Sequence, residues 1–398
     1  MGNKNLKVLL ITQNFPPETV GGATHNYEMA KYLQKKGCDV EVLTTYPTYP
    51  YGEFNPKNKF YTKVKRNGLI IHKLWTYQPN QSNPPFLERL AEYGIFSLHS
   101  FFKGLYKKNF DAIITSQPPE FTLFAGYFLK KILDVPWILD VRDLWLENAA
   151  SLGFLNKNSL PYKSFEKSRK KALKDVDIFA YTAETIREEF TDKYDFNCKF
   201  LFNPNGVDPA EYPFKKERKN QLIYIGNIGL AYDVSNLVKA MEYVDKDLKL
   251  IIRGGGDDKP RVKKLVKEKN LESKVEFIEK LSRSDLLELI SNSKIGLCPL
   301  KNKKSLKSVI PTKVIEYMGC GVPFIGTGKG EIRKLAEESN AGIITDNDPK
   351  KIADSINTMI EDSENLKELN ENGRKYVKKK FNKPKIINRL YNEIMNVI

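Results

Sequence analysis

The sequence predicts an α/β protein in which two doubly wound domains face each other across a cleft. Three observations support this fold class. At 398 residues, the chain is too long for one ordinary hydrophobic core. Short runs rich in β-branched residues alternate with helical stretches, which is typical of parallel sheets with helices on both faces. The runs also fall into two series of roughly six each, which indicates two sheets.

The expected strands place a domain boundary near residue 205. Strands are predicted at 7–12, 39–45, 69–75, 111–116, 137–141, 177–181 and 199–202, and then at 222–226, 248–253, 275–278, 295–299, 324–326 and 342–345. Between the two series, Asn203-Pro204-Asn205-Gly206 breaks regular structure. We therefore expect an N-terminal domain at 1–205, a second domain at 206–380 and a C-terminal helix at 381–398 that packs back on the first. Because such sheets bind ligands beyond the carboxyl ends of their strands, the loops that follow strands carry the candidate site.

Composition limits the classes of partner and compartment. The formal net charge of +16 favours an anionic partner, although a lysine-rich proteome would give the same excess. The four cysteines form no CxxC pair, which argues for a reducing compartment and against a zinc site or a disulfide framework. No window has about 20 consecutive apolar residues, and no signal-peptide core precedes the first strand. We expect a cytoplasmic protein, peripheral on the inner face of the cell membrane if it contacts one.

The loop after the first expected strand carries Gly21-Gly22 and, one turn later, His25. The GxGxxG fingerprint is missing there, and GxxxxGK[ST] occurs nowhere in the chain, which excludes the ordinary dinucleotide and P-loop sites. Paired glycines at a helix start let the backbone approach a bulky ligand. A plain flexible loop is the alternative interpretation. The place of the loop after strand one favours binding.

Asp140-Val141-Arg142-Asp143 ends the strand expected at 137–141. Alternation along a strand puts Asp140 and Arg142 on the same side, with Asp143 just beyond. A carboxylate beside a guanidinium can bind a sugar or orient an acceptor hydroxyl, whereas the structural alternative is an internal ion pair that holds the loop. We favour the functional interpretation and take Asp140, Arg142 and Asp143 as the candidate catalytic residues.

Glycine-rich loops also follow the first two strands of the second series. Gly226 and Asn227 end the first strand, where glycine leaves backbone amides open to a phosphate. Arg253 ends the next strand, before three glycines, and is a candidate phosphate partner. Lysines at 301–307 could also neutralise a pyrophosphate, but for any one of them a solvated loop is the better interpretation.

The segment 310–325 is the most informative in the chain. Pro311 and Thr312 stand at an expected helix start, Lys313 follows, and Glu316 lies one turn in. The helix start offers free N–H groups to a phosphate, and Glu316 could accept hydrogen bonds from two hydroxyls of a ribose. Local sequence alone leaves a nucleotide clamp and an ordinary αβ junction equally open.

A further helix is expected at 86–108, with apolar residues at helical spacing and lysines at its end. It fits a membrane-docking amphipathic helix. An ordinary core helix fits equally well.

These motifs resemble those of glycosyltransferase family 4, within the GT-B superfamily. The matching blocks follow the family's order and spacing, and they are Phe15-Pro16-Pro17 with Gly21-Gly22, Asp140–Trp145 with Glu147, Pro204–Asp208, Gly226-Asn227 and Pro311–Pro323. The resemblance covers essentially the whole chain. The Asp-Val-Arg-Asp-Leu-Trp block is similar to that of a branch with capsule, O-antigen and colanic-acid transferases.

The resemblance implies a retaining, metal-independent enzyme with no cofactor and a nucleotide-diphospho-sugar as co-substrate. It places Glu316 on the donor ribose, and Thr312, Lys313 and the Gly226 backbone at the diphosphate. Gly21 and Gly22 would lie near the diphosphate and the acceptor, and Asp140 and Arg142 near the sugar that is transferred. The family's pattern has a second Glu where this chain has Ser308. It also has an Arg and a Lys near Asn227 and Asp233.

We therefore expect a glycosyltransferase that moves a sugar, on UDP, to a polyprenyl-phosphate-linked or glycan acceptor in cell-surface polysaccharide synthesis. Its expected contacts are a nucleotide sugar, that acceptor and a membrane surface, with no nucleic acid. A nucleotide-sugar epimerase of the same build would convert a UDP-sugar without an acceptor. A non-enzymatic protein that binds anionic surfaces would show steep salt dependence and no turnover.

Overall fold

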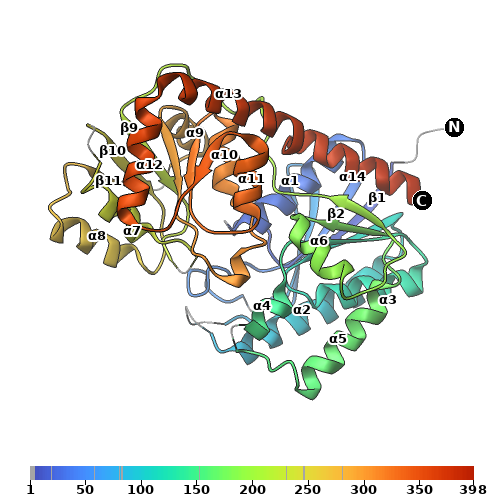
Figure 1. Cartoon of the computed structure of the whole chain (residues 1–398). Helices are drawn as coiled ribbons and strands as arrows, with labels where there is room; N and C mark the ends of the chain where they lie inside the picture. The colour runs from blue at the N-terminus through green and yellow to red at the C-terminus, as the bar shows by residue number, and fades with distance from the viewer. Residues whose placement is uncertain are drawn as a thin grey trace. The chain divides into compact units, whose positions relative to one another are not determined.

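The chain folds around two β-sheets, whose strands are mostly connected by helices (Figure 1). The computed structural model describes residues 5–18, 20–57, 59–79, 81, 84–151, 153–229, 231–244, 247–279 and 281–398. They form two compact units, one of Met1–Asn205 with Pro384–Ile398 and one of Gly206–Lys383. The first four residues of the N-terminal domain expected at 1–205 lie outside the described residues.

Within the described residues, the N-terminal unit contains a sheet in the order β3-β4-β2-β1-β5-β6-β7-β8. Its strands are β1 (Lys7–Ile11), β2 (Asp39–Thr45), β3 (Tyr61–Arg66), β4 (Leu69–Leu74), β5 (Ala112–Gln117), β6 (Trp137–Val141), β7 (Ile178–Tyr181) and β8 (Lys199–Phe202). Its helices are α1 (Gly21–Lys35), α2 (Phe86–Lys107), α3 (Thr122–Leu133), α4 (Trp145–Ser151), α5 (Leu160–Leu173), α6 (Glu184–Thr191) and α14 (Lys383–Val397). Since β1, β5, β6, β7 and β8 pair in parallel, their carboxyl ends meet at one edge.

Strand β3 is absent from the sequence prediction. It pairs antiparallel with β4 at the outer edge of the sheet, with Tyr61 opposite Leu74 and Arg66 opposite Leu69. Its sequence YTKVKR is basic, and none of its side chains is fully buried. Charged residues are how sheet edges avoid pairing with other chains, and they also remove the apolar run by which a strand is recognised. The sheet is therefore mixed, not purely parallel.

Within the described residues of the second unit, all strands pair in parallel in the order β11-β10-β9-β12-β13-β14. The strands are β9 (Gln221–Ile225), β10 (Lys249–Arg253), β11 (Val275–Ile278), β12 (Ile295–Cys298), β13 (Phe324–Gly326) and β14 (Gly342–Ile344). The helices are α7 (Val234–Ala240), α8 (Lys259–Glu268), α9 (Arg283–Ser291), the 3₁₀ turn η1 (Lys304–Leu306), α10 (Thr312–Gly319), α11 (Glu331–Ser339), α12 (Pro349–Glu361) and α13 (Ser363–Lys380).

The C-terminal helix α14 belongs to the N-terminal unit. Its Ile386, Ile387, Leu390 and Ile394 are buried in the same hydrophobic cluster as Val8 of β1. Helix α2 forms as the amphipathic pattern predicts. No helix within the described residues combines the length and apolar character that crossing a bilayer requires.

Candidate active site

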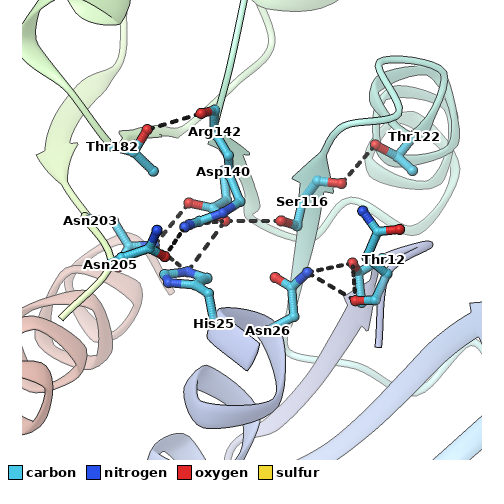
Figure 2. A network of polar contacts seen from close by, with 11 residues as sticks. Thr12, His25, Asn26, Ser116, Thr122, Asp140, Arg142, Thr182, Asn203 and Asn205 are labelled. Carbon is cyan, nitrogen blue, oxygen red and sulfur yellow. Dashed lines mark hydrogen bonds and ion pairs between the residues drawn. The ribbon is translucent and has the colours of Figure 1, made fainter. Parts of the chain in front are cut away.

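Asp140, at the carboxyl end of β6, is the centre of a buried polar network (Figure 2). Ser116 of β5 donates a hydrogen bond from Oγ to Asp140 Oδ2 at 3.0 Å. Asn203, just after β8, donates from Nδ2 to Oδ1 at 2.9 Å. The residues come from separate strands, and they meet because parallel strands end at the same edge of the sheet. The carboxylate is therefore fixed from both of its oxygens.

Two nitrogen-bearing side chains complete this network. Nη1 of Arg142 lies 3.5 Å from Asp140 Oδ2, and Nε2 of His25 lies 3.6 Å from the same oxygen. Burial alone would raise the pKa of the Asp140 carboxyl, but Arg142, His25 and Asn203 together hold that pKa well below its usual range. Asp140 is thus an anion at neutral pH, and the neighbouring side chains stabilise its negative charge.

The partners of Asp140 are themselves held in place. Arg142 Nη2 donates to Asn205 Oδ1, and Thr182 Oγ1 donates to the Arg142 carbonyl at 3.2 Å. His25, only 2% exposed, projects from α1 and lies 3.5 Å from Asn203 Nδ2. The result is a rigid array in which Arg142 and His25 are oriented by a central carboxylate.

Asp143 does not join the contacts with Asp140. It lies past the strand, and burial, followed by the negative charge of Glu147, raises the pKa of its carboxyl to about 6. Its Oδ1 is buried without a hydrogen-bond partner among the described residues. Glu147 in turn accepts from Arg169, whose Nη1 also lies 3.0 Å from Glu120 Oε1. This buried ion cluster is a structural support behind the loop.

Gly21 and Gly22 open helix α1, as the sequence predicts. The preceding residue, Val20, makes no side-chain capping bond, so the first N–H groups of the helix are not satisfied by a cap. A Cβ on Gly22 would meet Asn14 Nδ2 only at 3.7 Å, an ordinary contact. Steric exclusion therefore does not require glycine at position 22.

A pair of buried carboxylates in this unit escaped the sequence analysis. Glu18 accepts hydrogen bonds from the N–H groups of Thr48 and Tyr49, at 2.9 and 3.0 Å. Glu92 of α2 accepts from the Gln13 amide at 2.8 Å and from the Thr48 hydroxyl at 2.6 Å. Burial raises the pKa of each carboxyl to about 7. Glu18 lies in the loop that follows β1, but nothing in its local sequence indicates that it is buried near Glu92, 74 residues away.

In the second unit, the loops after β9 and β10 pack backbone against backbone. Gly226 has φ +116°, which favours glycine. A Cβ on Gly254 would overlap the carbonyl oxygen of Gly226, and one on Gly256 would overlap that of Ile228. The N–H of Ile228 donates to Gly255 O at 2.8 Å. Asn227, a predicted ligand residue, lies against Gly229 and Gly256 through its Oδ1.

Lys313 of α10 brings a buried amine to this glycine turn. Its side chain lies so close that a Cβ on Gly226 would stand 3.2 Å from Cε and 3.3 Å from Nζ. Nζ is buried and has no hydrogen-bond partner among the described residues. It lies 4.0 Å from the ring centroid of Tyr224 and 3.3 Å from that of Tyr232. Burial lowers the pKa of the Lys313 amine to about 8.

Glu316, one turn further along α10, is paired with a residue that sequence reasoning missed. Its Oε1 lies 2.7 Å from Nη1 of Arg283, the first residue of α9. Arg283 also donates to the hydroxyl of the buried Tyr212. The Glu316 side chain is 13% exposed and that of Arg283 53%, so an incoming group can reach this pair. Pro311 is the N-cap of α10 and Thr312 its first residue.

The remaining candidate cations are less closely placed. Arg253 ends β10 and forms no ion pair with any other described residue. Lys303, Lys304 and Lys307 are exposed on the segment around η1, whereas Ser308 is buried at 7% exposure. Among the described residues, no group of three or more His, Cys, Asp or Glu is placed to hold a metal ion.

Two family descriptions match successive parts of the chain. Residues 20–211 match Glycosyltransferase Family 4, and residues 210–376 match Glycosyl transferases group 1. A putative colanic acid biosynthesis glycosyl transferase, WcaI of Escherichia coli K12, is 24% identical over 98% of this chain and 100% of its own length.

Solved structures share the fold over the full length. Sucrose-phosphate synthase from Thermosynechococcus elongatus covers 99% of this chain and 100% of its own, with a TM-score of 0.77 and 18% identity. Anabaena HepE, solved in complex with UDP-glucose, covers 98% of this chain and 100% of its own, with a TM-score of 0.69 and 14% identity. These likenesses confirm the predicted GT-B architecture.

Proposed function

Since the chain belongs to glycosyltransferase family 4 and has the GT-B fold, we propose that it transfers a sugar from a UDP-sugar to a lipid-linked or glycan acceptor in cell-surface polysaccharide synthesis. We further propose that transfer retains the anomeric configuration, needs no metal ion, and takes place on the cytoplasmic face of the membrane. The observation that carries the donor assignment is the buried amine of Lys313 beside Gly226, which has no hydrogen-bond partner among the described residues.

A buried cation without an anionic partner costs free energy, so its place needs a reason. A diphosphate supplies one. The Lys313 amine would pair with its oxygens, while the start of α10, which has no side-chain cap, would offer backbone N–H groups to the same charge. The UDP-glucose complex of HepE supports this class of donor.

The ribose assignment rests on the Glu316–Arg283 pair. A carboxylate that is 13% exposed can accept hydrogen bonds from two neighbouring hydroxyls. Arg283 then has to release at least one Glu316 oxygen as the nucleoside enters. Because Arg283 is half exposed, this pair contributes little stability and is easily exchanged.

The chemical task is to stabilise a departing diphosphate and a sugar with oxocarbenium character. Preorganised N–H groups and the Lys313 cation would meet the charge that develops on the leaving group. These hydrogen-bond donors and this cation of the chain would take the place of a metal ion in neutralising the charge on the diphosphate. In the N-terminal unit, Asp140 is engaged by Ser116, Asn203, Arg142 and His25, which favours a positioning role. His25 and Arg142 are then the groups it would orient toward the sugar or acceptor.

The decisive experiment incubates the purified protein with a panel of UDP-, GDP- and TDP-sugars and a membrane lipid extract. We expect release of UDP together with labelled glycolipid, both dependent on the extract. No nucleotide release with any donor would refute the transferase proposal. Interconversion of a UDP-sugar in the absence of extract would instead identify an epimerase.

A variant pair tests the ribose contact. Glu316→Ala should weaken UDP binding by about tenfold to a hundredfold, because a charge-assisted hydrogen bond contributes about 1.5–3 kcal/mol. Glu272→Ala, at an exposed position of the same unit, is the matched control. Equal UDP affinity of the two variants in calorimetry would contradict the assignment.

A further inference from the structure

A groove between α2 and the edge strand β3 lies outside the residues assigned to sugar and nucleotide. Its volume is about 520 Å³, within the range of sites for small molecules. The lining is almost entirely apolar and aromatic, and consists of Phe60, Tyr61, Trp75, Ile95, Leu98, His99, Phe102, Lys103 and Tyr106. The walls of the groove are α2, the start of β3 and Trp75, which follows β4. The sequence could not show it, since β3 itself was not recognised.

The outer wall of the groove is an exposed apolar stripe. Leu98, Phe102 and Tyr106 stand at successive turns of α2 and are 58%, 58% and 80% exposed. Helix α3 extends the stripe with Phe128 and Ile132, which are 49% and 55% exposed. Helices α2 and α3 pack against each other (Figure 1). Phe101 of α2 lies against both Phe102 and Phe128, with ring centroids 5.2 and 6.0 Å apart, and we call these exposed side chains the α2–α3 ridge. Large contiguous apolar surfaces of this kind mark sites of interaction.

The groove is bordered by positive charge. Lys103 Nζ lies 3.9 Å from the ring centroid of Tyr61 and 5.4 Å from that of Tyr106. Lys63 stands two residues from Tyr61 on the same face of β3 and so borders the same groove. Burial, and then the positive charges of Lys107 and Lys63, lower the pKa of the Lys103 amine. Lys107 is paired with Glu41 at 2.8 Å. Lys63 and Lys103 form no ion pair with any residue that the structure describes.

Two polar groups in the groove are already engaged by the protein. The Tyr61 hydroxyl is hydrogen-bonded to His72 Nδ1 at 2.8 Å, and His99 Nδ1 donates to the Trp75 carbonyl at 3.1 Å. A bound peptide would bring backbone N–H and C=O groups that need partners. A hydrocarbon chain brings none, and a phosphate at its end would meet Lys63 and Lys103. The apolar lining and the basic border thus fit the two ends of an anionic lipid.

We propose that this groove takes a hydrocarbon chain of an anionic membrane lipid, with the lipid phosphate beside Lys63 and Lys103 and the α2–α3 ridge in the interface. This inference rests on the proposed function in one respect only, the contact with a membrane, to which it assigns a surface of the protein. The groove also lies on the side of the sheet where the parallel strands have their carboxyl ends, which is the side of Asp140. This follows because Tyr61, the first residue of β3, pairs with Leu74, the last residue of β4. Four strand spacings separate β4 from β6, roughly 19 Å at about 4.8 Å each. A lipid-linked acceptor anchored nearby would have its head group on the side of the sugar site.

Vesicle sedimentation tests docking without donor or acceptor. We expect the protein to bind vesicles of phosphatidylcholine with phosphatidylglycerol, to bind phosphatidylcholine alone at least tenfold less, and to be released by salt. Phe102→Asp and Lys63→Glu should each weaken binding at least tenfold. Tyr243→Asp, at a residue 44% exposed in the other unit, should bind like the wild type. If Phe102→Asp and Lys63→Glu lose vesicle binding but still bind UDP, the lipid groove and the nucleotide site are tested independently of each other.

Fluorescence quenching tests whether a chain enters the groove. Of the three tryptophans, Trp75 lines the groove and Trp137 is buried in the sheet. Trp145 packs against Phe86, Tyr93 and Phe121 and does not line the groove. Vesicles with brominated acyl chains should quench the wild type, and Trp75→Phe should lose most of that quenching while still sedimenting. Binding without quenching of Trp75, or equal binding by Phe102→Asp, would overturn the proposal. The proposal would also be overturned if the wild type did not bind vesicles but formed a dimer in light scattering, and if Phe102→Asp were a monomer.

Discussion

Replacing Lys313 should make the protein more stable and at the same time weaken its binding of UDP. The amine has an ordinary pKa of 10.5, and burial lowers it to about 8. At 1.36 kcal/mol for each pKa unit, keeping the buried amine charged at pH 7 costs about 3 kcal/mol. Contact with the rings of Tyr224 and Tyr232 offsets about 1–2 kcal/mol of this. Lys313→Met keeps an unbranched side chain, so we expect a net gain of about 1–2 kcal/mol at pH 7.

The sign of the pH dependence gives a sharper test. Between pH 8 and 10.5, the unfolded chain keeps the Lys313 proton while the folded protein releases it, so the unfolded state binds more protons. Stability of the wild type relative to Lys313→Met should therefore rise with pH across this window, and the gain of the variant should disappear by about pH 10.5. UDP affinity of the wild type should fall above pH 8, where the cation is lost.

Urea unfolding at pH 7 and pH 10 measures the stability difference, and calorimetry with UDP measures binding. We expect Lys313→Met to bind UDP about tenfold to a hundredfold more weakly, as for loss of a hydrogen bond between charged groups. Lys378→Met, at an exposed position on α13, should change neither quantity. A variant that is less stable than the wild type at both pH values, or that binds UDP normally, would refute the reasoning.

Two further predictions concern backbone and charge. Gly254→Ala should reduce UDP affinity at least tenfold, because its Cβ would overlap Gly226 O and displace that turn, whereas Gly255→Ala meets nothing within 4 Å and should bind normally in calorimetry. Asp140→Ala should cost about 3–5 kcal/mol in urea unfolding at pH 7, because Arg142 loses its buried anionic partner. Since its neighbours depress the Asp140 pKa, this cost should shrink only as the pH falls below 3.8, and a cost below 1 kcal/mol at pH 7 would contradict the network.

Regular patterns explain what the sequence revealed. Alternating apolar runs predicted the strands that lie inside the sheets, such as β2 and β6, with their observed bounds. Strand β3 was missed because an edge strand with Lys63 and Lys65 has no apolar run. Asp140, Arg142 and His25 could be selected because strand ends are the expected place for polar groups, and the structure brings these three together.

Partners that depend on tertiary packing could not be read in the same way. Asn203 was interpreted as part of a linker, since Pro and Asn-Gly follow it, yet its amide binds Asp140. Glu316 and Arg283 are 33 residues apart on different helices, and no local signal links them. The resemblance to glycosyltransferase family 4 implied that Lys313 faces the diphosphate. The burial of the Lys313 amine without a hydrogen-bond partner among the described residues is a property of the folded protein alone.

The difference between Asp140 and Lys313 bears on which residue acts on substrate. Both are buried charges. Four side chains of its own unit contact the Asp140 carboxylate, whereas Lys313 Nζ has no hydrogen-bond partner among the described residues. A satisfied charge contributes to the fold, and removing it leaves its partners unpaired. An unsatisfied one lowers stability until an anion binds. The geometry therefore shifts the catalytic expectation from Asp140 toward the groups it orients, Arg142 and His25. In the proposed function, Lys313 is the buried cation whose free-energy cost the donor diphosphate would lower.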